Sequence, residues 1–188
     1  MKQLNNTFFQ YLVLSFLSIG LESCNNNNNN DDESIRPTLE IPPVNLTNLN
    51  VVLIFGEELS PDQKNPAFEY IMSDPTDLVM ATSSGRVETI LLNNNVSDYE
   101  IRIRLEENPD WLVIHDHVLN LQVAEGDTVN AGTILGVVGM LNRTELQLNN
   151  GKGNSTIAHC PINYGSDHFI LEHESIMANW CLEKTVIP

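Results

Sequence analysis

The sequence is poor in basic residues, and this shortage excludes one large class of partners. Nine Lys and Arg stand against 25 Asp and Glu, which gives a formal net charge of -16. Binding to a nucleic-acid backbone needs clustered Lys and Arg that displace counterions, and the sequence contains no such cluster. It also lacks an apolar run long enough to cross a membrane as a helix. We therefore expect no nucleic-acid partner and no membrane-spanning helix.

Cysteines are few, and one of them lies where a bacterial lipoprotein is acylated. An apolar run from Phe8 to Leu21 follows Lys2, with the length of a signal-peptide core. The run leads into Leu21-Glu22-Ser23-Cys24, which resembles a lipobox. We interpret 1–23 as a signal peptide and Cys24 as the lipidated residue. The alternative is a cleaved signal that leaves a free Cys24. The predicted location is the cell envelope, lipid-anchored at the outer membrane on its periplasmic or surface face.

The segment after Cys24 lacks side chains that could form a core. It begins with the asparagines at 25–30, continues with acidic residues, and contains Pro37, Pro42 and Pro43. Such a composition cannot bury enough apolar surface to offset the entropy of ordering. We therefore predict a flexible tether over 24–48.

Strand signals dominate the rest of the chain. Residues 50–55 form a short apolar run, and 101–105 and 111–117 alternate apolar with polar side chains. Leu119, Leu121 and Val123 continue this alternation up to a Gly126-Asp127 turn. Gly132, Gly136 and Gly139 then mark bends or close backbone approaches. One helix is predicted, over 170–182.

Three stretches together resemble a known family. They are Val79-Met-Ala-Thr-Ser-Ser-Gly85-Arg-Val87, the run from His117 through Gly126-Asp127 to Gly139, and Gly153-Asn-Ser-Thr-Ile-Ala-His159-Cys160-Pro161. In this order they are similar to motifs of the lysostaphin-like zinc peptidases, the M23 family, over about residues 65–162. The resemblance implies an all-β domain with a small antiparallel sheet, related to barrel-sandwich hybrid folds. We place this domain at 49–162 and a C-terminal extension with a short helix at 163–188.

The resemblance also implies a site, and the site is degenerate. His117 and His159 match the two catalytic histidines of the family. The three zinc-ligand positions correspond to Asn65, Glu69 and Pro161. Of these only Glu69 is an ordinary zinc ligand, because an amide oxygen binds zinc poorly and proline has no donor atom. We therefore expect no bound cofactor and no catalysis, since the histidines need a metal-activated water.

Two other arrangements keep catalysis open. His115 and His117 are two residues apart on a predicted strand and share a face, so with His159 they form an alternative zinc site. Cys160 is a possible nucleophile with a histidine base. Adjacent strand residues point to opposite faces, however, which argues against a pair of Cys160 with His159. The more natural reading of Cys160 and Cys181 is a disulfide in an oxidising compartment.

Three functions therefore remain. The first is a non-catalytic domain that binds peptidoglycan peptides or regulates an envelope hydrolase. The second is an active zinc endopeptidase that cuts peptidoglycan cross-links through a rearranged metal site. The third is a biotinyl- or lipoyl-like hybrid adaptor. A carrier of that kind needs a lysine at a hairpin tip, and the sequence between Val87 and Val123 contains none.

Overall fold

A computed structural model describes residues 36–151 and 156–188, which belong to one compact unit that spans Glu33–Pro188. The predicted signal peptide and the predicted lipidation at Cys24 lie outside the described residues. Within the described part, no helix has the length and apolar character required to cross a membrane.

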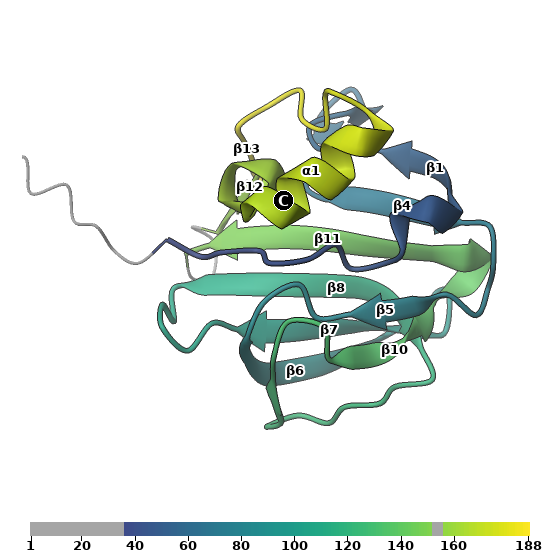
Figure 1. Cartoon of the computed structure of the whole chain (residues 1–188), viewed down its shortest axis with the longest axis vertical. Helices are drawn as coiled ribbons and strands as arrows, with labels where there is room; N and C mark the ends of the chain where they lie inside the picture. Colours follow the sequence, from purple (N-terminus) through teal and green to yellow (C-terminus); the bar gives the residue numbers. More distant parts are fainter. Residues whose placement is uncertain (1–35, 152–155) are drawn as a thin grey trace, which may run out of the picture. The chain divides into compact units, whose positions relative to one another are not determined.

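All described strands except β2 and β3 belong to one antiparallel sheet system (Figure 1). Its main path has the order β1-β4-β11-β8-β7-β6-β9, and β10 pairs with both β5 and β8. The strands on this path are β1 (Leu49–Leu53), β4 (Phe68–Met72), β11 (Arg143–Asn150), β8 (Trp111–Leu119), β7 (Asp98–Arg104), β6 (Gly85–Asn93) and β9 (Thr128–Val129). The remaining elements are β2 (Glu58–Ser60), β3 (Gln63–Lys64), β5 (Leu78–Met80), β10 (Ile134–Val138), β12 (Ile157–His159), β13 (Thr185–Val186), the helix α1 (Asp167–Ile176), and the 3-10 turns η1 (Leu46–Asn48), η2 (Met140–Asn142) and η4 (Pro161–Tyr164). The predicted all-β class with one short helix is confirmed.

The central strands bury one face and leave the other half-buried. On β4, Phe68, Tyr70 and Met72 are buried, whereas the alternate side chains are partly exposed. Leu146 and Leu148 of β11 are fully buried in the same way. This alternation is the period-2 signature of a strand with one face in the core. Polar side chains therefore collect on the opposite face of β4, β11 and β8.

The sheet departs from the predicted strands after His117. β8 ends at Leu119, and the predicted continuation through Leu121 and Val123 is wrong. Asn120 has a positive φ of 52°, which turns the chain out of the strand. Both apolar side chains are nevertheless half-buried against the core, and this explains their apolar character.

The predicted tether ends earlier than expected. Leu39, Val44 and Leu46 are at most 4% exposed. Backbone hydrogen bonds tie this segment to the domain: Glu40 N–H donates to Thr82, and Met80 N–H donates to Pro43. Its apolar residues lie between prolines and polar residues, so composition alone made it resemble a linker. Residues 38–48 are part of the folded domain.

The C-terminal segment packs on the same core. Ser166 caps α1 by accepting a hydrogen bond from Phe169 N–H, so the helix begins before the predicted residue 170 and ends at Ile176. Phe169 and Trp180 are buried against the sheet. Cys160 and Cys181 form a disulfide with a sequence separation of 21. A loop of this length contributes about 3 kcal/mol in the chain-entropy description.

Candidate functional site

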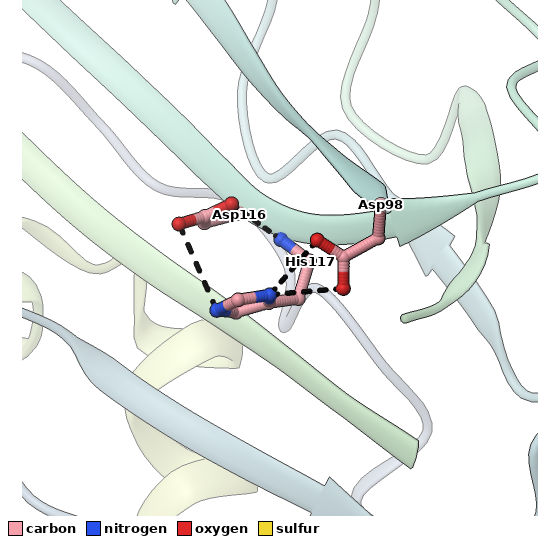
Figure 2. A group of neighbouring side chains, drawn as sticks. All are labelled: Asp98, Asp116 and His117. Atoms are coloured by element: carbon pink, nitrogen blue, oxygen red, sulfur yellow. Dashed lines mark hydrogen bonds and ion pairs between the residues drawn. The ribbon is translucent and has the colours of Figure 1, made fainter. Parts of the chain in front are cut away.

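The end of β8 holds a histidine in an uncommon backbone conformation. His117 has a φ of 56°, in the left-handed region that non-glycine residues seldom adopt and that is enriched at functional sites. Its Nδ1 lies 3.0 and 3.1 Å from the two carboxylate oxygens of Asp98 (Figure 2). Asp98 is fully buried and accepts further hydrogen bonds from the Asn93 side chain and the Met140 N–H. These bonds fix the position of the imidazole.

A glycine is required beside this pair. A Cβ atom at Gly139 would lie 2.5 Å from Asp98 Oδ2 and 2.8 Å from the backbone carbonyl of His117. The close approach that the sequence predicts at Gly139 is therefore present, and it serves the His117 and Asp98 pair.

The other side of the His117 ring faces charged side chains. Its Nε2 lies 3.5 Å from Glu145 Oε1 and 3.8 Å from Asp116 Oδ2. Arg143 contacts the same nitrogen through Nη2, and its Nη1 donates to Glu69 Oε1 at 3.0 Å. We call this group the His117 cluster: Glu69, Asp98, Asp116, His117, Arg143 and Glu145.

The carboxylates of the cluster decide the charge of His117. Burial lowers the pKa of His117, and the positive charge of Arg143 acts in the same direction. The hydrogen bond with Glu145 and the two neighbouring aspartates outweigh them and raise the pKa of His117 to about 9. An arginine can only donate, so the contact of Arg143 with Nε2 fits the neutral ring. At neutral pH the imidazolium instead directs its Nε2 proton to Glu145, while Arg143 stays paired with Glu69.

Asp98 stays ionised beside it. Burial raises the pKa of Asp98, but the hydrogen bonds from Asn93, His117 and Met140 prevail and lower it below its ordinary value. The buried carboxylate and the imidazolium therefore form a charged pair. A pair of this kind orients the ring and holds its proton, instead of leaving a free base.

β11 brings the second set of charges to the site. It lies between β4 and β8, with Glu145 opposite both Glu69 and Asp116 in the strand register. Arg143 and Glu145 are two residues apart and so share one face of the strand. They hold the positions beside Glu69 and His117 that the family resemblance assigned to His159 and Pro161.

His159 lies elsewhere, and the expectation that it shares a site with His117 is wrong. It pairs with Leu148, three residues beyond Glu145, which is roughly 10 Å along the strand. Its ring packs against Trp111, and its Nδ1 is 3.0 Å from the Tyr164 hydroxyl. Burial lowers the pKa of His159. Pro161 follows His159 into η4, away from the cluster.

His115 belongs to the core. It is fully buried, and among the described residues neither ring nitrogen has a hydrogen-bond partner. Burial lowers the pKa of His115 to about 3. It is neither a surface residue nor a ligand near His159, so the structure does not bring together the alternative site of His115, His117 and His159.

Asn65 serves the local backbone. It is 3% exposed, its amide nitrogen donates to the Ile54 carbonyl at 3.2 Å, and its Oδ1 accepts from Ala67 N–H at 3.1 Å. Both ends of the amide are thus occupied. The residue fixes the entry into β4, and this role explains its burial.

One group of potential metal ligands is present in the described part of the chain. Ligand atoms of Asp98, Asp116 and His117 lie within 4.8 Å of one another. The two carboxylates flank opposite sides of the imidazole (Figure 2). A zinc ion needs its donors at about 2 Å, so it could join these three only by breaking the bonds that now hold the ring. Asn65 is held by backbone partners and Glu69 by Arg143, so the side chains as they lie do not fit a zinc ion.

Sequence reasoning missed Asp98, Arg143 and Glu145. The available signal was position: Arg143-Thr144-Glu145 begins four residues after Gly139, and Arg143 and Glu145 have the i, i+2 spacing that places two side chains on one strand face. It was overlooked because His159 offered a matching residue type farther along. Trp111 is 6% exposed and is a core residue.

Comparison with solved structures identifies the fold. Lysostaphin from Staphylococcus simulans aligns with a TM-score of 0.54 and 20% identity, over 76% of this chain and 57% of lysostaphin. Its catalytic domain aligns with a TM-score of 0.51 and 23% identity, over 63% of this chain and 93% of that domain. A chain of the SpoIIQ–SpoIIIAH pore-forming complex aligns with a TM-score of 0.53 and 16% identity, over 74% and 96% respectively.

In sequence, no protein-family model and no curated protein matches the chain significantly. The alignment also covers little more than half the length of full-length lysostaphin, at 57%. At these identities the similarity concerns architecture. The described domain has the fold of the lysostaphin-like M23 peptidases.

Proposed function

We propose that the protein is a cell-envelope lipoprotein whose M23-like domain binds peptidoglycan peptides without cutting them. The observation that carries this proposal is the occupied His117 cluster. Hydrolysis by this fold requires a metal that activates water. Here an arginine and an engaged asparagine stand at the positions where donors are needed.

The cluster is suited to recognition. The side chains of Glu69, Asp116 and Glu145 keep 12%, 21% and 20% of their surface exposed on the half-buried face of the sheet. Partly buried carboxylates on a chain of net charge -16 attract ammonium groups more strongly than fully solvated ones do. A peptide with free amino groups is the ligand that this chemistry favours.

A protein partner, such as an envelope hydrolase, is the second candidate. One solved structure with this fold belongs to a pore-forming complex of two proteins, SpoIIQ and SpoIIIAH. That observation supports the use of the architecture as a docking domain. Because the similarity is one of fold, the identity of a partner has to be found by experiment.

Two features of the sequence and the structure support the proposed location in the cell envelope. Cys24 after a signal-like run supports lipid anchoring, and the Cys160–Cys181 disulfide supports an oxidising compartment. Labelled fatty acid should enter the wild type and not Cys24→Ala. Equal labelling of the two proteins would contradict the lipid anchor.

Binding and cleavage are separated by one assay. The purified full-length chain is incubated with insoluble peptidoglycan; it should sediment with the polymer and release no peptides. Glu145→Lys, which reverses a cluster charge, should weaken sedimentation. Glu88→Lys, at an exposed glutamate on β6 paired with Arg104, is the matched control and should sediment like the wild type. Failure of the wild type to sediment contradicts peptide binding, and peptide release that is lost in His117→Ala contradicts the non-catalytic assignment.

A further inference from the structure

We infer that the guanidinium of Arg143 is the resident cation of the His117 cluster and keeps metal ions out of it. This inference rests on the proposed non-catalytic function and assigns its cause to one side chain. Peptidases with this fold bind a zinc ion, whereas here the positive charge belongs to the Arg143 side chain.

The geometry carries this inference. From β11, Arg143 donates to Glu69 on β4 and places its other terminal nitrogen against the His117 ring on β8. These are two positions at which the family resemblance places a metal ligand and a catalytic histidine. Arg143 Nε is buried without a partner among the described residues, so the donors it uses are those aimed at the cluster.

The four carboxylates of the His117 cluster outnumber its two cations, Arg143 and the protonated His117, so Arg143 offsets part of an excess of negative charge. Glu69, Asp116 and Glu145 converge on the same side of the His117 ring, while Asp98 holds the other side. With Arg143 present, each approaching metal ion meets a fixed positive charge within a few ångströms. Without it, a zinc ion that displaces the Nε2 proton of His117 would meet that nitrogen together with nearby carboxylates, which is a donor set that zinc accepts.

Arg102 provides the contrast. It also lies half-buried on the sheet, on β7, and pairs with a glutamate, Glu100. Among residues 36–151 and 156–188, the ion pair with Glu100 is the one that Arg102 forms, and no histidine takes part in it. Removal of its charge should therefore create no ion site.

Zinc titration tests the inference directly. Full-length wild type, Arg143→Gln, Arg143→Lys and Arg102→Gln are freed of metal with a chelator and titrated with zinc by calorimetry at pH 7.5. Arg143→Gln removes a positive charge from beside the metal position, so its zinc affinity should exceed that of the wild type by at least about a hundredfold. Arg143→Lys keeps the charge and should stay close to the wild type, as should Arg102→Gln. Adding Glu69→Gln to Arg143→Gln should remove most of the gain.

Folding is monitored in each variant by thermal melting. Arg143→His, which keeps a polar side chain and adds a donor, is the second variant and should also gain zinc affinity. If both variants fold and bind zinc no better than the wild type, while the wild type is zinc-free, the inference is overturned and the proposed function stands. Tight zinc binding by the wild type would overturn both.

Discussion

Two histidines on β8, only two residues apart, occupy opposite chemical environments. His115 is fully buried among apolar side chains, and burial lowers its pKa to about 3. His117 is also largely buried, yet carboxylates raise its pKa to about 9. Burial alone therefore does not determine the charge of a histidine. Whether a carboxylate reaches the ring decides it.

The same contrast separates the core from the site. His173 resembles His115: its Nδ1 contacts the Phe169 carbonyl at 2.8 Å, its Nε2 lies 2.8 Å from the Tyr70 hydroxyl, and burial lowers its pKa to about 4. Its partners are neutral, so it stays neutral. The His117 cluster is built from charged partners on four strands, and it lies where β8 leaves extended geometry.

The largest effect is expected when the cluster is given metal donors. The variant Asn65→His, Glu69→Asp, Arg143→His and Glu145→His places donors on β4, on β11 and on the segment that leads into β4. The variant removes the guanidinium and adds three imidazoles. Its zinc affinity should therefore exceed that of the wild type by at least about a hundredfold. Adding Pro161→His to the wild type is the control. A similar gain from Pro161→His would show that η4, and not β11, belongs to the site.

Acid stability should depend on the core histidines. The pKa of His115 is lower in the folded protein than its value of 6.5 in the unfolded chain, so the unfolded state takes up more protons below that pH. Stability is therefore present above pH 6.5 and is lost as the pH falls toward 3. When the pH falls from 6.5 to 4.5, this residue should lower the free energy of unfolding by about 2 kcal/mol.

Urea unfolding at the two pH values measures this loss. His115→Leu should flatten the dependence and should not lower stability at neutral pH, because it removes two unpaired polar atoms from the core. His168→Leu, at an exposed helix position, is the matched control. An unchanged pH dependence in His115→Leu would place the acid sensitivity elsewhere.

At alkaline pH, His117 should make the free energy of unfolding fall as the pH rises. Its pKa is higher in the folded protein than in the unfolded chain, so its stabilisation is complete below pH 6.5 and disappears as the pH rises through 9. After allowance for solvent screening the loss should be about 1 kcal/mol. Glu145→Gln should reduce it, and Glu100→Gln should not. Titration of the His117 ring by NMR measures its pKa independently. A midpoint near 6.5 would contradict the claim that neighbouring carboxylates raise this pKa.

Local patterns predicted the framework of the domain. The alternation at 111–117 placed β8 correctly, and the glycine at 139 marked a real close approach. The alternation is a local property of one strand, whereas the close approach at Gly139 involves Asp98 and His117, which are distant in sequence. The predicted tether failed at Leu39, Val44 and Leu46, because three spaced apolar side chains become core only when a distant surface receives them.

The site was harder to predict for a related reason. A charge cluster is defined by strands that meet in space, and Asp98, Glu69 and Arg143 come from three separate parts of the sequence. His159 matched by residue type, but pairing with Leu148 places it well away from His117. His115 could be assigned to a face of its strand by alternation, but the sequence did not show that this face is the buried one.

The zinc content of the wild-type protein tests the central claim most directly. The full-length chain is expressed with added zinc, purified without chelator, and its metal content is measured by mass spectrometry. With Arg143 holding the cation position, the protein should contain far less than one equivalent of zinc. One equivalent in the wild type that is lost in His117→Ala would show that the cluster is a metal site and would contradict the assignment of this domain as a metal-free binding module.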